Sequence, residues 1–285
     1  MVLAYLALVG RILLTGYEKI VFKQVGENSG SEESVFLIFI TGTVFLLPFA
    51  LVVHWPESYS FLWIAAAASL VYTVQTVFYV KSLSHGEASL VAPLYYFSAF
   101  FLLVLTTVFL GESIGLLKLA GISLLVYGSS FLNRKQHILH SLKALATDRA
   151  CQFMLLSSAL VAVGRTVDGF MMRSVHPLVY CISLCIFTDI FLFVHLLATG
   201  RMGSAKAMFR TKLRVGATAG AVDVYSYLLL MYAITRIEVS IAEPASMLGM
   251  IVTVLLAHFI LREKIRERLV GVVIMVGGAW LLFLQ

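Results

Sequence analysis

The second half of this chain repeats the first half. A shift of 151 positions places Pro93 on Pro244, and proline is rare, with five in 285 residues. The same shift aligns further pairs: Glu87 with Glu238, Ser89 with Ser240, Leu105 with Leu256, Leu110 with Leu261, and Glu112 with Glu263. Each half contains five long apolar segments, and a repeat with an odd number of spans re-enters the bilayer in the opposite orientation. Secondary transporters use this inverted plan, so the repeat favours transport.

The composition is that of an integral membrane protein. Sixty per cent of the residues are hydrophobic, 13% are charged, and the mean hydropathy is +0.96. The apolar runs are close to the ~20 residues that a helix needs to cross the bilayer, and the ~10-residue alternating segments of an outer-membrane barrel are absent. We expect an all-α protein with ten transmembrane spans at about 2–22, 34–53, 61–80, 88–110, 115–132, 151–171, 177–198, 215–234, 239–261 and 269–284.

The basic residues predict an orientation in the membrane. The net charge is +6, which could suggest nucleic acid, but the loops after odd-numbered spans hold 15 Lys or Arg and the other loops with the termini hold three. The positive-inside rule then places the odd-numbered loops in the cytoplasm and both termini outside. We read the first apolar stretch as a span rather than a signal peptide, because it lacks a basic start and carries Arg11. A bacterial or archaeal plasma (inner) membrane is the simplest location.

The chain divides into residues 1–132 as the first repeat, 133–150 as a basic loop, and 151–285 as the second repeat. The loop, and residues 199–214, could each form a helix on the membrane surface or remain a solvated loop that fixes orientation. Small residues, Gly216 with Gly220 and the pairs Gly121/Gly128 and Gly271/Gly278, favour close helix packing within the chain or in a homodimer. Three cysteines in no metal-binding pattern are expected to be buried free thiols: Cys151, Cys181 and Cys185.

Two local patterns carry a family resemblance. Residues 87–94, an apolar helix and then Leu110-Gly111-Glu112-Ser113 resemble the fourth span and short turn of EamA-like members of the drug/metabolite transporter superfamily. The second half repeats the pattern at 238–244 and 261–264, with Arg262 in place of the glycine. The resemblance covers essentially the whole chain. It implies ten helices around a central cavity enclosed by spans 1 to 4 and 6 to 9, and transport of small organic metabolites. Relatives usually have cytoplasmic termini, contrary to the charge count.

Two arginines lie in the middle of spans, where an unpaired charge costs at least ~2.5–3.5 kcal/mol. Arg11 and Arg165 occupy equivalent places in spans 1 and 6, each preceded by Val-Gly. The repeat predicts that they face each other across the pseudo-two-fold axis. A guanidinium suits a carboxylate or phosphate, so at least one of them could bind an anionic group of the cargo. The alternative is a structural ion pair.

Three acids in the second half are candidates for proton coupling. Asp168 lies one helical turn after Arg165, while Asp189 and Asp223 lie in spans 7 and 8. A cargo that competes for an arginine would change the cost of ionising a nearby acid, which couples binding to protonation. Asp223 is the preferred candidate because no base lies within one turn of it on its own helix. A permanent salt bridge to Arg11 or Arg165 is equally compatible with the sequence.

Polar residues of spans 3 and 9 could line the transport path. Gln75 and Tyr79 share a face of span 3, and Glu243 stands directly before Pro244. Tyrosine can enclose a small polar cargo, but interfacial belts and helix packing use it as well. For Glu243 we consider two roles: a structural cap at a helix start, or cation binding and gating.

The motifs of enzymes and of nucleotide-driven pumps are absent from the sequence. We expect no catalytic residue, cofactor or metal, and a monomer or homodimer in contact with membrane lipid and not with nucleic acid. The sequence therefore predicts a secondary transporter of a small, polar, carboxylate-bearing metabolite such as an amino acid, working by alternating access with proton coupling or exchange. One alternative is efflux of amphiphilic cations bound by Asp168, Asp223 and Glu243. A membrane-embedded enzyme or a lipid-handling scaffold is the alternative from another class.

Overall fold

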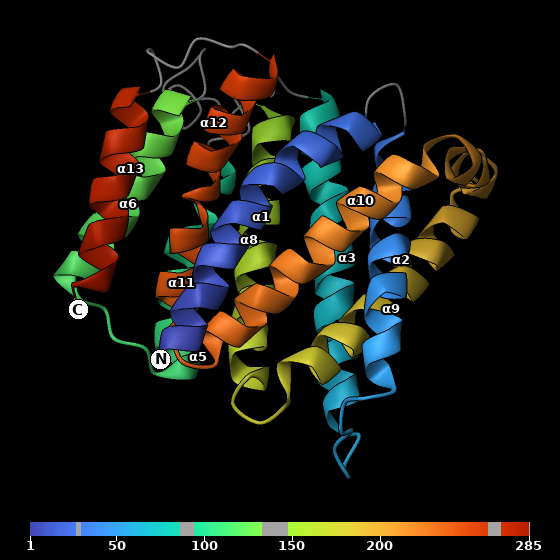
Figure 1. Ribbon diagram of the computed structural model, residues 1–285, viewed down its shortest axis with the longest axis horizontal. Helices are drawn as coiled ribbons and strands as arrows, with labels where there is room; N and C mark the ends of the chain where they lie inside the picture. Colours follow the sequence, from blue (N-terminus) through green and yellow to red (C-terminus); the bar gives the residue numbers. More distant parts are fainter. Residues whose placement is uncertain (27–29, 86–93, 133–147, 262–268, 285) are drawn as a thin grey trace. The chain divides into compact units, whose positions relative to one another are not determined.

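A computed structural model covers the chain and describes residues 1–26, 30–85, 94–132, 148–261 and 269–284. In these ranges the structure consists of helices and connecting turns, without strands, which confirms the predicted fold class (Figure 1). The helices are α1 (Val2–Gly26), α2 (Ser31–Ala50), α3 (Phe61–His85), α5 (Ser98–Leu110), α6 (Leu116–Leu132), α8 (Arg149–Met171), α9 (Pro177–Ala198), α10 (Met202–Ile234), α11 (Val239–Ser246), α12 (Gly249–Leu261) and α13 (Leu269–Phe283).

Five of these helices are long and apolar enough to cross a membrane: α2, α3, α8, α9 and α10. Helix α9 begins with local signals that the sequence carries. Pro177 occupies its first turn, and the His176 ring accepts a hydrogen bond from the backbone N–H of Leu178 at 3.3 Å. Proline suits this position because the first N–H groups of a helix lack intrahelical partners.

Helix α10 is longer than the eighth span that the sequence predicts. It begins at Met202, within residues 199–214, and changes direction at Lys212, whose φ is −122° and ψ is 15°. The segment before the predicted span is therefore helical from Met202. The other predicted surface helix, in residues 133–150, and the motif at 87–93 fall almost entirely outside the described residues, as do Arg262 and Glu263.

The chain packs as two compact units. Unit 1 comprises Met1–Thr73 and Val167–Arg236, and unit 2 comprises Val74–Thr166 and Ile237–Gln285. Each unit combines helices from both sequence repeats, and α3 and α8 contribute to both units. The two sequence repeats therefore do not coincide with the two packing units. Each packing unit contains helices from both repeats.

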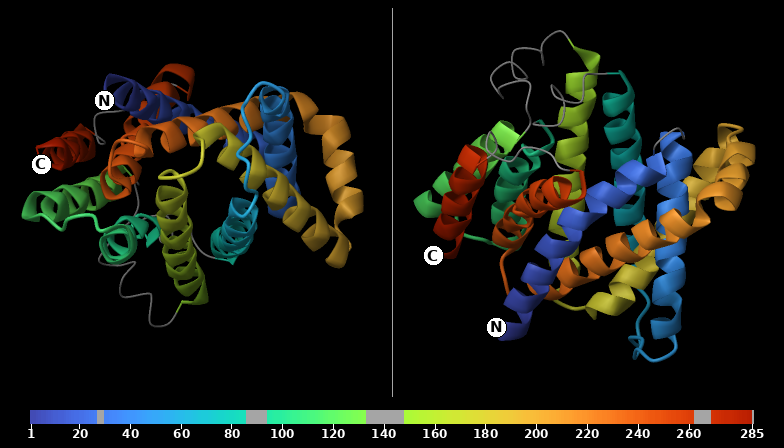
Figure 2. Two further views of the ribbon diagram at one scale, coloured as in Figure 1. Left: turned by 90° about the horizontal axis from the view of Figure 1, so that it is seen from below. Right: turned by 45° about the horizontal axis from the view of Figure 1, so that its top comes forward.

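In unit 1, α10 packs along α1 and α2, and α2 also packs against α9 (Figures 1 and 2). Glycines make the α2–α10 approach close. A Cβ on Gly220 would lie 2.5 Å from the backbone nitrogen of Gly42, and one on Gly216 would lie 2.6 Å from the Leu37 side chain. The prediction that Gly216 and Gly220 serve close helix packing within the chain is confirmed.

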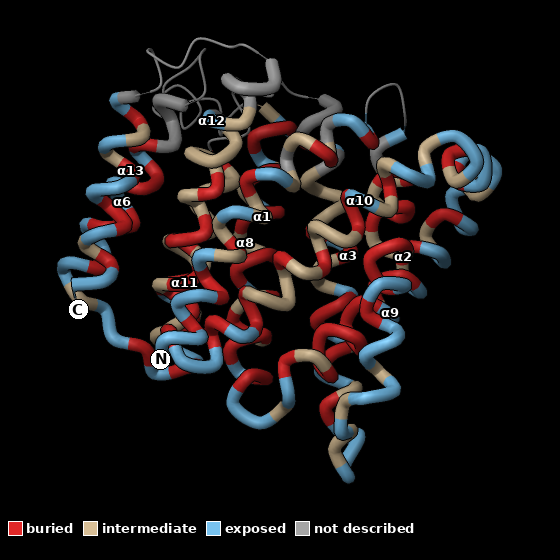
Figure 3. The backbone as a smooth tube through the Cα atoms, viewed as in Figure 1, coloured by how far each residue is buried: buried red, intermediate tan, exposed pale blue. Residues whose placement is uncertain are grey.

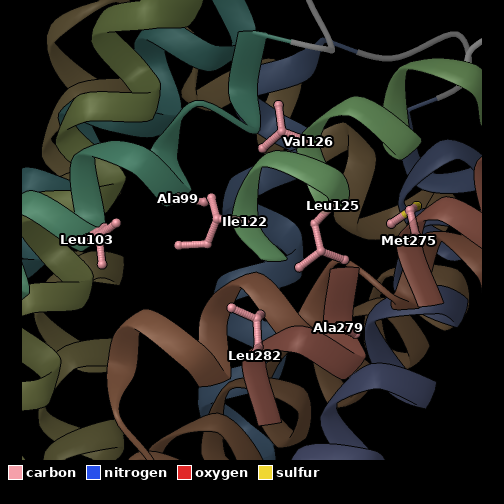
Figure 4. Packing of buried hydrophobic residues seen from close by; sticks show 8 residues of the cluster. All are labelled: Ala99, Leu103, Ile122, Leu125, Val126, Met275, Ala279 and Leu282. Atoms are coloured by element: carbon pink, nitrogen blue, oxygen red, sulfur yellow. The ribbon is translucent and has the colours of Figure 1, made fainter. Parts of the chain in front are cut away.

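In unit 2, the last helices of the two repeats, α6 and α13, lie side by side (Figures 1 and 2). A Cβ on Gly121 would come within 2.7 Å of the Gly278 carbonyl oxygen, so these backbones touch. Both helices are buried on one face and exposed on another (Figure 3). An apolar cluster joins them to α5 (Figure 4): Ala99, Leu103, Ile122, Leu125, Val126, Met275, Ala279 and Leu282.

The fourth and ninth spans are interrupted at equivalent places. Tyr96 and Phe97 form a turn before α5, and Met247 and Leu248 form a turn between α11 and α12. The backbone N–H of Phe97 donates to the Leu94 carbonyl at 3.1 Å, and that of Leu248 donates to the Ala245 carbonyl at 3.0 Å. These are the tighter i→i+3 bonds of a 3₁₀ turn. The sequence repeat is therefore visible as a repeated break in the backbone.

Candidate functional site

Arg165 and Glu243, two residues that the sequence singles out, meet in unit 2. Arg165 lies on α8, and its Nε is 3.2 Å from the Glu243 Oε1 on α11. Both side chains retain slight exposure, 11% for Arg165 and 21% for Glu243. The second carboxylate oxygen, Oε2, is buried and has no hydrogen-bond partner among the described residues. The contact to Arg165 Nε thus uses one oxygen of the Glu243 carboxylate, and both side chains are partly exposed.

Glu243 does not cap the start of α11, which corrects one of its two predicted roles. The cap comes from Glu112 of the first repeat, whose carboxylate accepts the backbone N–H of Val239 at 2.7 Å and that of Ser240 at 3.0 Å. Glu243 lies further along the helix, directly before Pro244. Its carboxylate is therefore available for the ion pair with Arg165.

Lys118 binds the start of α11 together with Glu112, and the sequence analysis did not identify it as a site residue. Its ammonium group is fully buried and bonds to Glu238, to the Ser240 hydroxyl at 3.0 Å and to the Ser113 carbonyl at 2.7 Å. One signal was present in the sequence, because Glu112, Glu238 and Ser240 all belong to the repeated motif. The motif of one repeat binds the motif of the other, a pairing that no comparison within a single half can reveal.

Arg11 is held within unit 1 by neighbouring polar groups. Its side chain on α1 donates from Nη1 to the Ser226 hydroxyl of α10 at 2.5 Å, and Nη1 is 3.8 Å from Glu18 Oε2. Thr15 lies 3.2 Å from the same Ser226 hydroxyl. The Nε of Arg11 is buried without a hydrogen-bond partner among the described residues. Since Arg11 and Arg165 belong to different units, their facing across the repeat axis stays a prediction.

Asp168 is enclosed by tyrosine hydroxyls. Tyr72 donates to its Oδ2 at 2.6 Å and Tyr180 donates to its Oδ1 at 2.8 Å. The residue is completely buried, and the Tyr227 ring packs edge-on against Tyr72 with centroids 6.5 Å apart. Both carboxylate oxygens are therefore engaged by the protein, which is the arrangement of a structural hydrogen-bond centre.

Asp189 and Asp223 lie on α9 and α10 in unit 1. Both carboxylates are within electrostatic range of the buried Cys185 thiol on α9. Asp189 accepts a hydrogen bond from Thr43 of α2, while its Oδ1 has no hydrogen-bond partner among the described residues. Asp223 lies half-buried on α10, one turn before Ser226. The sequence predicted each acid separately, and their common proximity to the Cys185 thiol could not be predicted from it.

Gln75 and Tyr79 both face α8 in unit 2. The Gln75 side-chain amide donates to the Ser157 hydroxyl at 2.8 Å, and that hydroxyl donates to the backbone carbonyl of Gln75 at 3.2 Å. The Tyr79 ring packs edge-on against Tyr95 at 5.3 Å, beside Met154. These contacts join α3 to its neighbours. A role in lining the path stays a prediction for both residues.

A separate cavity lies in unit 1. Its volume is about 420 Å³, and it is lined by Phe49, Val52, Val53, His54, His176 and Leu178. These residues come from the end of α2, the loop after it and the start of α9. None of the predicted site residues is among them, so the cavity does not coincide with the polar groups described above.

Long apolar helices, a duplicated plan and ion pairs inside spans define a helical membrane protein of the transporter type. The chain belongs to the EamA-like transporter family, whose model matches residues 2–134 and 148–284. The two matched segments correspond to the two halves of the repeat, and the family consists of transporters rather than enzymes. The resemblance inferred from the sequence is thereby confirmed, together with the two-repeat, ten-helix architecture and a location in a membrane.

One solved structure, titled only "Crystal structure of protein", is similar with a TM-score of 0.74. The match covers 99% of this chain and 96% of that one at 14% sequence identity, a level that supports the fold alone. A search of curated proteins gave no significant match.

Proposed function

We propose that this transporter moves a small polar metabolite with a carboxylate, such as an amino acid, across the plasma membrane by alternating access. The odd-numbered loops face the cytoplasm in this proposal. The driving force is an ion gradient or exchange. One observation carries the cargo class: the Arg165 guanidinium is held by one oxygen of Glu243 and keeps some exposure inside a membrane span. The planar fork of a guanidinium suits the two oxygens of a cargo carboxylate.

The surroundings of Asp168 and Glu243, two of the three acids in that alternative, argue against amphiphilic cations as cargo. A cationic cargo needs a carboxylate that it can reach, and Asp168 is fully buried with both oxygens bonded to tyrosine hydroxyls. Glu243 already forms an ion pair with Arg165, so a cation that bound Glu243 would have to break this pair. Breaking such a pair is costly, which favours the anionic cargo.

A thermal-unfolding screen of the purified protein tests this proposal. The probes are single amino acids, the bare carboxylates lactate and pyruvate, and the cations ethidium and tetraphenylphosphonium. A ligand that binds the folded state raises the unfolding temperature by mass action. We expect at least one carboxylate compound to stabilise the wild type, with the effect lost in Arg165→Gln. Stabilisation by the cations alone would contradict the proposal.

A further inference from the structure

We infer that the proton is the driving ion of this transporter and that Asp189 carries it as a neutral acid. Asp189 lies near the middle of α9 in unit 1. The inference rests on the proposed function, because it assigns the driving ion of the proposed transport. The sequence analysis preferred Asp223 among three acids, whereas the hydrogen bonds around Asp189 favour this residue.

The Asp189 carboxyl group is buried in its span and has few polar neighbours. Its exposed fraction is 7%, and its Oδ1 has no hydrogen-bond partner among the described residues. Its Oδ2 contacts the Thr43 hydroxyl of α2. An ionised carboxylate inside a membrane span needs a cation or several donors, because water is not there to solvate it. Asp189 has one hydroxyl for this purpose.

The second contact of Thr43 indicates where the proton lies. The Thr43 hydroxyl is also 3.1 Å from the Phe39 carbonyl oxygen, four residues earlier on α2. A threonine hydroxyl has one hydrogen, and a carbonyl oxygen only accepts. Both contacts of Thr43 are therefore full hydrogen bonds when Asp189 carries the proton and donates to Thr43, while Thr43 donates to Phe39. The neutral acid fits this geometry better than the carboxylate does.

No cation balances Asp189 in the part of the chain that the structure describes. None of the ion pairs formed there includes Asp189. The basic residue of α9 itself is His195, which is bound to Glu32 at 3.0 Å. Helices α2 and α10 pack against α9; α2 carries no Lys, Arg or His, and α10 carries its basic residues before Val215. Burial without a partner cation favours the neutral acid.

The titratable groups that face Asp189 do not favour its charged form either. The Cys185 thiol, one turn earlier on α9, is within electrostatic range of both Asp189 and Asp223 of α10. An ionised Asp189 would add negative charge to surroundings that already contain an acid, which is unfavourable. Toward the start of α9, Tyr72 and Tyr180 are bonded to Asp168.

Glu33 shows how a buried acid is held as an ion in the same unit. It is 4% exposed, and Arg201 donates from Nε to Oε1 and from Nη2 to Oε2, each at 3.0 Å. This parallel pairing is the strong geometry for arginine and a carboxylate. Asp189 is as deeply buried and has a hydroxyl contact in place of the arginine. The two acids therefore form a matched pair for experiments.

The proposed proton transfer keeps the contact between Asp189 and Thr43. When the O–H bond of Asp189 breaks, the electron pair stays on the carboxylate and the proton passes to water on one side of the membrane. The hydrogen of the Thr43 hydroxyl then turns from the Phe39 carbonyl to the carboxylate. A proton taken up from the other side reverses both changes. Thr43 can bond either charge state, so we assign it as a positioning residue.

The first test compares neutral substitutions and needs no cargo. Thermal unfolding of the purified full-length chain is measured for the wild type, Asp189→Asn and Glu33→Gln. The asparagine amide is neutral and can donate to Thr43, so the unfolding temperature should stay within about 2 °C of the wild type. Glu33→Gln leaves Arg201 without its carboxylate and should lower it by at least about 5 °C. Equal losses in the two variants, or an Asp189→Asn chain that does not fold, would overturn the inference.

Infrared spectroscopy observes the proton itself. A protonated carboxyl group has a C=O stretch that is separate from the bands of carboxylates and amides and that moves in heavy water. The difference spectrum between the wild type and Asp189→Asn should contain this band, and Thr43→Val should shift it, because the acid loses its acceptor. The control is Glu33→Gln, whose difference spectrum should lack the band. A wild type without the Asp189 band would show that Asp189 is ionised and would refute the assignment.

Proteoliposomes test the coupling to transport. A difference of about one pH unit across the membrane should drive up to about tenfold accumulation of an amino acid by the wild type, if one proton moves with each molecule. Asp189→Asn should keep counterflow and lose this accumulation, a split that a folding defect does not produce. Accumulation that persists in Asp189→Asn, or a wild type that ignores the pH difference, would contradict the inference. If no carboxylate compound is transported, the proposed cargo class fails, and the infrared band still decides whether Asp189 holds a proton.

Discussion

At the residue scale, Asp168 and Glu243 differ in what surrounds each carboxylate. Asp168 is fully buried and accepts hydrogen bonds from Tyr72 and Tyr180, whereas Glu243 keeps 21% side-chain exposure and one oxygen without a hydrogen-bond partner among the described residues. A carboxylate satisfied by fixed hydroxyls stabilises the fold. The hydrogen bonds of Asp168 therefore favour a structural role for this residue.

The structural role of Asp168 predicts a loss of stability when one donor is removed. Tyr180→Phe deletes a hydroxyl 2.8 Å from the Asp168 Oδ1 and leaves that buried oxygen short of a partner. The expected loss in the free energy of unfolding is about 1–3 kcal/mol. Thermal unfolding in detergent measures it. The control is Tyr232→Phe, since Tyr232 is exposed on α10. An unchanged midpoint in Tyr180→Phe would refute the structural role.

Residue types along the chain indicated which side chains matter, but not how they pair. The sequence singled out Arg165 and Glu243, yet their 3.2 Å contact depends on the packing of α8 near α11, which no local pattern encodes. It linked Asp168 to Arg165 by helical spacing, and the structure adds two tyrosine donors from α3 and α9. Lys118 was missed because its partners lie at 238 and 240, far along the chain.

At the element scale, glycines set how closely helices approach. In α13, a Cβ on Gly278 would come within 2.8 Å of the Gly121 carbonyl oxygen, whereas one on the adjacent Gly277 would meet nothing within 4 Å. Because the obstacle for Gly278 is backbone, the helices must move apart to admit a methyl group. The neighbouring glycines therefore form a matched pair for testing helix packing.

Gly278→Ala should destabilise the protein by about 1–3 kcal/mol through overpacking. Gly277→Ala should be neutral or slightly stabilising, since alanine has the higher helix propensity. Thermal unfolding of both variants under one set of conditions gives the comparison. Equal midpoints for the two would mean that the α6–α13 contact is looser than described.

The spans themselves could be predicted because each needs an apolar run of sufficient length, and this requirement is local. The breaks at Tyr96–Phe97 and Met247–Leu248 could not be placed as well. The prolines at 93 and 244 marked the region, but the turns follow three and four residues later. The site of a break depends on which backbone bonds the neighbouring helices support, which the sequence does not state.

At the scale of the whole molecule, each packing unit combines helices from both halves of the duplication. Unit 1 joins α1 and α2 to α9 and α10, and unit 2 joins α5 and α6 to helices α11 to α13. The repeat boundary near residue 133 is visible in the sequence because it lies in a basic loop. The packing boundaries run through the middle of α3 and α8, where composition gives no signal.

The charge distribution predicts the orientation of the molecule. Ser58, in the loop after α2, should lie outside, and Lys206, in the basic segment before the eighth span, should lie in the cytoplasm. Single cysteines at these positions are treated with a membrane-impermeant maleimide. Ser58→Cys should react in intact cells, and Lys206→Cys only after permeabilisation. The native cysteines are buried and serve as the unlabelled background. The reverse pattern would invert the proposed orientation.

Counterflow in proteoliposomes tests most directly that Arg165 carries a carboxylate cargo. Vesicles loaded with one unlabelled amino acid are diluted into the same labelled compound, for the wild type, Arg165→Lys and empty vesicles. We predict accumulation of at least one amino acid by the wild type and a rate at least about tenfold lower for Arg165→Lys, because lysine keeps the charge but loses the planar donors. Equal rates for the two proteins, or transport of tetraphenylphosphonium but of no amino acid, would contradict the account.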